Sequence, residues 1–340
     1  MYKLIKKYLP IAFLTVLAVS CGKQERFFPK EMTPVKIEIV RIDSAILSLP
    51  TDSAGIEEGI ERLCKEQTQG IEIFSEDVLG IYDENLDKLT SELVGFLNDT
   101  VYGFKEINKQ VKEKFADISD IQKDFDEAFT RLHYLYPEWQ LPTLYFTVSG
   151  FTANAWGREN QEYVVGTDMY MGKDFPYYNN VVYEYQKKQM ERDFIVLHIT
   201  RNYIDQFFFD KAGNRMIDRM LYEGRLCYMM QQILPRKTKA QIMGYTEEEI
   251  RWCEKFEKQI WGVICDKQDL FTTNRITIGS YMNDGPFTSE VSQDSPARLG
   301  IWVGWRIVES YMKNHPEMSL QQMMELEDSQ VILQESKYRP

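Results

Sequence analysis

A stripe of polar side chains on an otherwise apolar segment is the feature of this sequence best suited to chemistry. The segment from Phe194 to Ile199, FIVLHI, is apolar nearly all the way round a helix, which is typical of a buried helix. His198, Asn202 and Asp205 follow at i, i+4 and i+7 and therefore share one face. Polar groups on a buried helix need partners or a water-filled cleft. The pattern predicts a cleft above His198.

The spacing of this stripe invites comparison with zinc peptidases. Their H-E-x-x-H motif places two imidazoles one helical turn apart, and its glutamate activates the bound water. The five residues here are His198-Ile199-Thr200-Arg201-Asn202. Ile199 cannot act as a base, and Asn202 is a poor zinc ligand. The sequence therefore predicts a degenerate site with no catalytic residue, and a protein that is not an enzyme.

A second segment could contribute to the same cleft. Glu223 lies where a third, downstream glutamate ligand would be expected. One imidazole, one amide and one carboxylate do not form the usual His₂Glu set, and Arg201 adds a charge that disfavours a divalent cation. We therefore expect no metal ligands and no cofactor. Arg201 could instead pair with Asp205 at i, i+4. The expected vestigial cleft comprises His198, Arg201, Asn202, Asp205 and Glu223.

The elements that position this cleft can be predicted from periodicity. Alternating residues predict strands at 35–42, 143–148 and 163–167, the last two joined by a loop at 149–162. Helical spacing dominates 53–136 and most of the chain after Pro176. The later helices are expected at 184–209, 218–234, 247–266 and 298–313, with Thr246 and Ser319 in capping-box positions. Residues 269–296 lack periodicity and are expected to form a long loop over the cleft.

Two glycines in the expected helix at 298–313 indicate a close helix contact. Gly300 and Gly304 lie one turn apart, and Gly304 stands between Trp302 and Trp305. Each glycine costs roughly 1 kcal/mol in a helix interior. Close packing against another backbone would compensate for that cost, and the helix that carries His198 is the expected neighbour.

Composition excludes several classes of protein. The 340 residues are 44% apolar and 27% charged, which is enough apolar material for a sizeable core and excludes disorder as the dominant state. The net charge of −12 argues against nucleic acid as a partner. No linker or repeat divides the chain, so residues 35–340 are expected to form one domain.

The N-terminus has the pattern of a bacterial lipoprotein signal. Lysines at positions 3, 6 and 7 precede an apolar run at 8–19, and small residues lead to Cys21. The run is shorter than the roughly 20 residues of a membrane-spanning helix. We expect a signal peptide at 1–20, acyl chains such as palmitate on Cys21 and a tether at 21–34. Gly22 in place of aspartate favours the outer membrane, and we expect the protein to face the periplasm.

On these residues the chain resembles the gliding motility lipoprotein B (GldB) family of the Bacteroidota, which is similar to predicted zinc-dependent peptidases. The resemblance is most specific in the segments 164–178 and 282–312, in the His198 helix and in the ending SKYRP. It implies a predominantly helical α+β fold of the zincin-like type, with a small sheet and a buried degenerate active-site helix. The helical part would be 53–136 and the zincin-like part 137–340. It also implies an envelope lipoprotein linked to gliding or its associated secretion machinery.

Three functions remain open at this point. The first is a noncatalytic, pseudoenzyme-like scaffold that binds an envelope protein partner or an envelope polymer. The second is an unorthodox metal-binding hydrolase that uses His198 and Glu223. The third is a purely structural assembly component without cleft chemistry.

Overall fold

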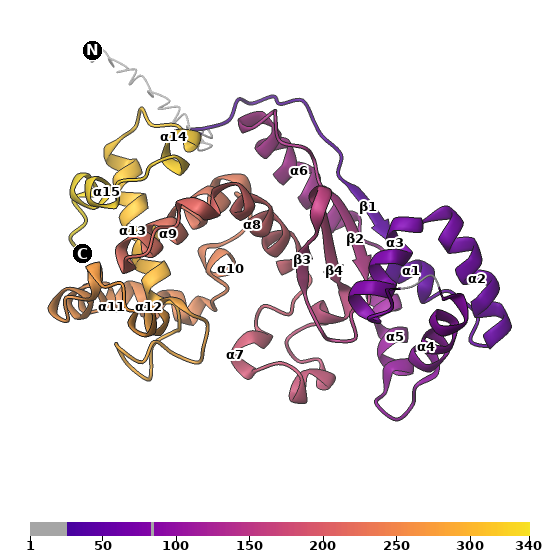
Figure 1. The fold of residues 1–340 in the computed structure, drawn as a ribbon. Coiled ribbons are helices and arrows are strands. Elements are labelled where there is room, and N and C mark those ends of the chain that lie inside the picture. Colours follow the sequence, from indigo (N-terminus) through magenta and orange to yellow (C-terminus); the bar gives the residue numbers. More distant parts are fainter. Residues whose placement is uncertain (1–25, 83–84) are drawn as a thin grey trace, which may run out of the picture.

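The chain folds into helices arranged around one small sheet (Figure 1). The computed structural model describes residues 26–82 and 85–340, so the predicted signal peptide and Cys21 lie outside the described residues. The expectation of a predominantly helical α+β fold is confirmed. The zincin-like assignment, and the division at residue 137, stay predictions. Within the described ranges, none of the helices combines the length and apolar character needed to span a bilayer.

The sheet is mixed, with strand order β1-β2-β4-β3. Its strands are β1 (Glu38–Arg41), β2 (Thr143–Thr147), β3 (Ala155–Gly157) and β4 (Glu162–Gly166). β1, β2 and β4 run parallel, with Val40 opposite Tyr145 and Tyr145 opposite Val164. β3 is antiparallel to β4 and lies in the segment expected as a loop. Three residues are too few for an alternation to be recognised.

The first strand is shorter than its alternating pattern predicted. The backbone N–H groups of Val35 and Ile37 donate to Thr130 Oγ1 (3.0 Å) and Asp126 Oδ1 (2.9 Å). Both acceptors lie on α6 (Ser119–Leu135). Because side chains of a helix use these backbone donors, ladder pairing begins only at Glu38.

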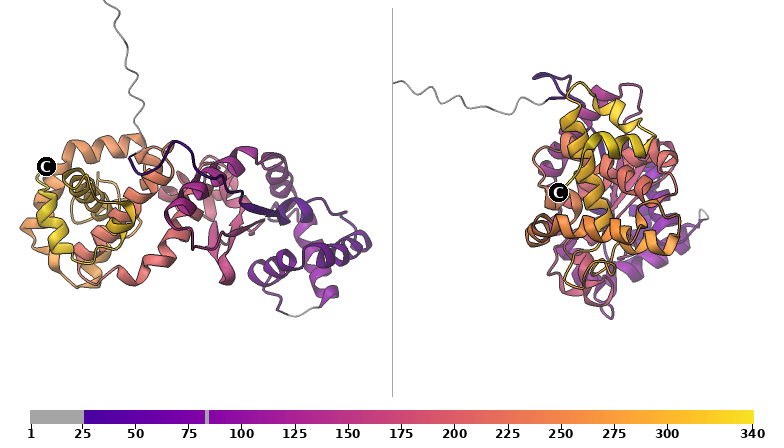
Figure 2. Two further views of the ribbon diagram at one scale, coloured as in Figure 1. Left: turned by 90° about the horizontal axis from the view of Figure 1, so that it is seen from above. Right: turned by 90° about the vertical axis from the view of Figure 1, so that its left-hand side faces the viewer.

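Helices from the first third of the chain gather at one end of the molecule, and Figure 2 shows them opposite the C-terminal helices. In Figure 1 they lie on one side of the sheet, with α8, α9 and later helices on the other. The early helices are α1 (Ile42–Ile46), α2 (Ser53–Glu66), α3 (Thr68–Ile73), a π-helical turn (Phe74–Val78), α4 (Leu86–Asn98) and α5 (Phe104–Lys114). The predicted helical character of 53–136 is therefore confirmed.

The second half of the chain is helical with two departures from expectation. Its helices are α7 (Glu184–Lys187), α8 (Phe194–Phe208), α9 (Met216–Ile233), α10 (Lys239–Met243), α11 (Glu247–Asp266), α12 (Arg275–Met282), α13 (Leu299–Asn314), α14 (Leu320–Met324) and α15 (Ser329–Ser336). Thr246 and Ser319 each form the predicted capping box. The single helix expected at 184–209 is wrong, because the chain breaks between α7 and α8. At this break the Met190 carbonyl accepts from Gly172 N (2.8 Å), and Glu191 Oε1 accepts from Lys173 N (2.9 Å).

The expectation of a loop over the whole of 269–296 is also wrong. Asn274 caps the N-terminus of α12, because its side chain accepts from Ile276 N (2.9 Å) and Thr277 N (3.3 Å). This cap stabilises the start of α12. The helix was not recognised in the sequence because its apolar Ile276 is exposed, so apolar and polar residues do not separate onto two helix faces.

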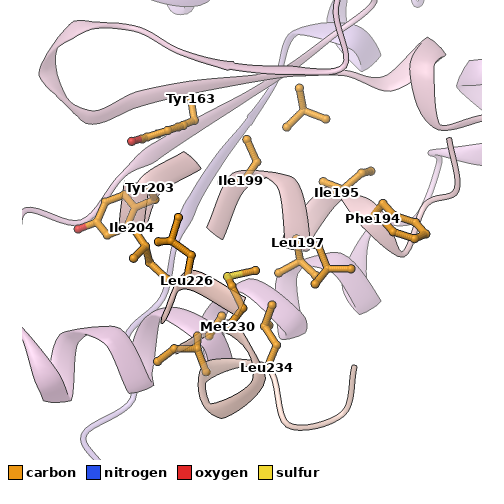
Figure 3. Close-up of a cluster of buried hydrophobic side chains, with 14 of the residues drawn as sticks. Tyr163, Phe194, Ile195, Leu197, Ile199, Tyr203, Ile204, Leu226, Met230 and Leu234 are labelled. Atoms are coloured by element: carbon orange, nitrogen blue, oxygen red, sulfur yellow. The ribbon is translucent and has the colours of Figure 1, made fainter. Parts of the chain in front are cut away.

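Helix α8 is apolar on two faces because it is enclosed on two sides. Figure 3 shows Ile195 and Ile199 pointing toward the sheet, near Tyr163, while Leu197 points toward Met230 of α9. Ile199 is fully buried and belongs to the core beneath the sheet.

Helices α9 and α13 cross at two glycines. A Cβ on Gly304 would lie 1.8 Å from the Met220 carbonyl oxygen, and one on Gly224 would lie 2.3 Å from the Gly304 carbonyl carbon. The predicted close backbone contact is thus confirmed, but its partner is α9 and not the His198 helix. Gly300 instead packs against Met282 of α12.

Residues 26–34, the second half of the expected tether, lie against the folded body. Arg26 donates from its guanidinium to the carbonyls of Met312 (3.0 Å) and His315 (2.8 Å), at the C-terminal end of α13. Phe28 is buried in the main core. The chain is therefore attached to the body from Arg26 onward.

Candidate functional site

A pocket of about 310 Å³ lies over the polar stripe of α8. The structure brings together His198, Arg201 and Asn202 at this pocket, as the sequence predicted. The other lining residues come from α8, α9, α10, α13 and the segments next to them: Gln189, Phe194, Leu197, Cys227, Met230, Gln241, Ile242, Met243, Gly244, Arg298 and Ile301. Segment 269–296 supplies none of this lining, so its expected role as the cover is wrong. Helix α10 forms that wall instead.

His198 is held by hydrogen bonds on both ring nitrogens. The Tyr170 hydroxyl donates to Nδ1 (2.8 Å), and Nε2–H donates to Gln189 Oε1 (3.3 Å). This pattern assigns the proton to Nε2. Burial lowers the pKa of His198 to about 4, assisted by the positive charges of Arg201 and Arg298. The imidazole is therefore neutral near pH 7.

The i, i+4 spacing predicted that Arg201 pairs with Asp205. In the structure Arg201 pairs instead with Glu223 of α9. Arg201 Nη2 lies 2.5 Å from Glu223 Oε2. Burial alone would lower the pKa of Arg201, but the Glu223 carboxylate reverses this effect and holds the pKa above its usual value. Asp205 accepts a hydrogen bond from the Tyr222 hydroxyl and does not line the pocket. Of the five residues expected to form the cleft, His198, Arg201 and Asn202 line the pocket, whereas Asp205 and Glu223 do not.

The donor set does not fit a catalytic zinc ion. Both nitrogens of His198 are already used, and Glu223 is neutralised by Arg201. Burial raises the pKa of the Cys227 thiol to about 12, which disfavours the thiolate that a metal requires. Over 26–82 and 85–340, no three His, Cys, Asp or Glu side chains are placed to hold a metal ion. Two guanidinium groups line the pocket, and their charge repels a cation.

Sequence reasoning missed the residues that close the pocket. Arg298 precedes α13 with φ +60, and its Nη2 donates to the Met243 carbonyl at 2.5 Å. Gly244 ends α10 with φ +64, and a Cβ there would lie 2.7 Å from Gln189 Cδ. Glycine at this position leaves room for the Gln189 carboxamide that holds His198. A glycine after a capped short helix was the one local signal; the contact to Gln189 is tertiary.

Two further buried carboxylates follow the parallel strands. Asp43 comes after β1 and binds Arg41 Nε at 2.7 Å. Asp168 comes after β4, and its carboxylate accepts from Ser149 N (2.7 Å) and Phe151 N (2.7 Å). Both carboxylates are engaged by protein groups, so they join the strand ends to neighbouring segments.

We expect the stability of the protein to contain an acid-sensitive contribution from His198. The folded protein binds this proton more weakly than the unfolded chain, whose histidine pKa is near 6.5. Stability is therefore unaffected by this group above pH 6.5 and falls as the pH drops toward 4. His198→Gln should remove this loss, so its stability relative to the wild type should improve by about 2–3 kcal/mol between pH 7 and pH 4. Urea denaturation across this range measures the difference.

Ile199→Val on the same helix is the matched control. It removes one buried methylene group and should lower stability by about 1 kcal/mol at every pH. A His198→Gln difference that is constant from pH 7 to pH 4 would contradict the assignment of the low pKa to His198.

The similarity of this chain to a known protein family extends over almost all of the described residues. Residues 27–340 match the family model described as gliding motility protein GldB. No curated protein matches the chain, and no solved structure matches it.

Proposed function

Because this chain belongs to the gliding motility protein GldB family, we propose that it is a noncatalytic, lipid-anchored envelope component of the gliding apparatus that binds a partner through the pocket above His198. Membership supports a gliding motility lipoprotein. The noncatalytic role, the partner and the location at the periplasmic side of the outer membrane belong to the proposal. Cys21 would carry the lipid.

The observation that carries the proposal is how the polar groups of α8 are used. A hydrolytic site needs a base or a metal beside an open position. Here the imidazole is neutral and held by Tyr170 and Gln189, and the carboxylate of Glu223 is paired with Arg201. Space nevertheless remains above these residues, within the size range of ligand pockets. An open pocket beside an imidazole and a carboxylate that already have protein partners favours binding over catalysis.

The position of the pocket relative to the N-terminal segment also supports binding. Arg26, five residues after Cys21, bonds to carbonyls at the C-terminal end of α13. Arg298, which lines the pocket, precedes the N-terminus of the same helix. A helix of 16 residues is about 24 Å long. The pocket thus lies at the end of α13 remote from the attachment of the N-terminal segment, where a partner can approach away from the lipid.

The test fills the pocket while leaving the surface unchanged elsewhere. Ile242 is half-buried on α10 and lines the pocket, so Ile242→Trp should occupy the space and abolish colony spreading in cells that carry it in place of the wild type. Ile276→Trp is the matched control, because Ile276 is 85% exposed on α12 and does not line the pocket. It should spread normally. Immunoblots of the membrane fraction verify equal amounts of both variants.

The two other functions give different results. The purified mature lipoprotein should cleave no peptide substrate with or without added zinc, and a chelator should leave its melting temperature unchanged. Chelator-sensitive cleavage would establish the metal-dependent hydrolase. Normal spreading of Ile242→Trp together with a defect of Ile276→Trp would favour an assembly component that acts through its outer surface.

A further inference from the structure

We infer that the pocket above His198 binds the free carboxylate end of an acylated amino acid or peptide whose last side chain is aliphatic. This inference rests on the proposed binding function and names the chemistry of the ligand. It follows from three groups of lining residues, each of which matches one part of such an end: two guanidinium groups, the carboxamides of Gln189 and Asn202 (with that of Gln241 beside them in the lining), and an apolar wall.

The charged part of the lining favours an anion. Arg201 and Arg298 both line the pocket, and the described lining contains no carboxylate. Arg201 contacts Glu223 through one Nη, which leaves other N–H donors of its guanidinium for a ligand. Arg298 Nε makes no hydrogen bond to any described residue, and its ion pair with Asp284 Oδ1 is 3.6 Å long. Two planar donor groups in the lining of one pocket suit a carboxylate.

The uncharged polar groups suit the amide that precedes a terminal carboxylate. Asn202 lines the pocket, and its carboxamide makes no hydrogen bond to any residue in the described part of the chain. Gln189 uses its Oε1 to accept from His198, which leaves its Nε2 to donate. A donor and an acceptor in the lining of the same pocket match the C=O and N–H of one peptide group.

The remaining lining excludes a simple inorganic anion. The apolar side chains form a wall that a phosphate or sulfate ion would leave in contact with water: Phe194, Leu197, Met230, Ile242 and Ile301. An aliphatic side chain beside the carboxylate would cover this wall. The pocket volume of about 310 Å³ lies at the lower end of the range for ligand sites, which fits one terminal residue and the amide before it.

Titration calorimetry on the mature lipoprotein in detergent micelles tests this inference with N-acetyl-L-leucine as the probe. The acid should bind saturably, and N-acetyl-L-leucinamide, which lacks the negative charge, should bind at least tenfold more weakly. Arg298→Gln should weaken binding of the acid at least tenfold. Because Arg298 also bonds to the Met243 carbonyl, Asn202→Leu provides a second variant of similar volume that should weaken binding without disturbing that contact.

Arg236→Gln is the matched control. Arg236 is half-exposed, pairs with Asp124 and Glu127 outside the pocket, and should leave affinity unchanged. Equal affinities for the acid and the amide, or no binding of the acid at millimolar concentration, would overturn the inference. The same titration with N-acetyl-D-leucine distinguishes two sources of a free carboxylate end. Protein C-termini carry L residues, whereas cell-wall stem peptides end in D residues. Loss of spreading by Ile242→Trp without binding of the acid would refute only the carboxylate inference and leave the proposed function standing.

Discussion

Gly304→Ala is expected to lower the free energy of unfolding by about 3 kcal/mol or more. The new Cβ would lie 1.8 Å from the Met220 carbonyl oxygen and 2.4 Å from its carbonyl carbon, so it meets backbone atoms of α9 that no rotamer change can move. Relief requires α9 and α13 to separate. Both helices contribute to the pocket, through Cys227 and Ile301. Urea denaturation followed by far-ultraviolet circular dichroism measures the loss.

The chain offers two glycines for a matched control of this prediction. Gly95 of α4 and Gly262 of α11 also lie inside helices, but nothing stands within 4 Å of a Cβ added to either. Alanine at these positions should stabilise the protein by about 0.5–1 kcal/mol, because it limits the unfolded backbone and favours the helix. A loss below about 1 kcal/mol for Gly304→Ala would show that the helices tolerate separation and that the glycine contact is not a structural requirement.

Asp168→Asn is expected to cost about 2–4 kcal/mol, although it changes neither size nor shape. The Asp168 carboxylate is 2% exposed and accepts from the backbone N–H groups of Ser149 and Phe151 and from the Ser149 hydroxyl (3.0 Å). An asparagine must direct its amide N–H₂ at one of these donors, which leaves buried hydrogen-bond donors facing each other. Phe151 adopts φ +63, so the carboxylate also holds a turn that a non-glycine residue rarely forms. A decrease in the melting temperature and in the urea midpoint of unfolding measures this loss of stability.

Asp52→Asn makes the same chemical change at a helix N-terminus. Asp52 caps α2 by accepting from Gly55 N (3.0 Å), and asparagine serves in this position about as well as aspartate. Its effect should stay within about 0.5 kcal/mol. If the two substitutions cost the same, the hydrogen bonds that surround Asp168 are not what stabilises the strand ends.

The residues around His198 illustrate how much of a site a single sequence contains. Positions four and seven residues from His198 share its helix face by geometry alone, and Asn202 therefore lines the same pocket. The i, i+4 rule also placed Arg201 near Asp205, yet the shorter contact runs to Glu223 on another helix. Periodicity describes one helix at a time, so it could not rank a partner on α9 against a partner on α8.

Local patterns determined the features that depend on a few consecutive residues. The capping boxes at Thr246 and Ser319 form as predicted, because each is completed within four residues. The apolar character of the α8 segment on more than one face, confirmed by the burial of Ile199 and Leu197, likewise follows from side-chain type. The close helix contact at Gly304 was predictable from the glycine spacing, but its partner was not.

The sequence by itself determined that a polar stripe carrying His198 would lie on a buried helix, that the fold would be mostly helical with a small sheet, and that the chain belongs to a lipoprotein family. Only the tertiary structure decided which helix meets Gly304, which carboxylate meets Arg201, and which residues close the pocket. These contacts join segments such as Gln189, Gly244 and Arg298 that are far apart in the chain. Their geometry depends on how whole helices pack, and helix packing is a collective outcome of many buried side chains that no local period encodes.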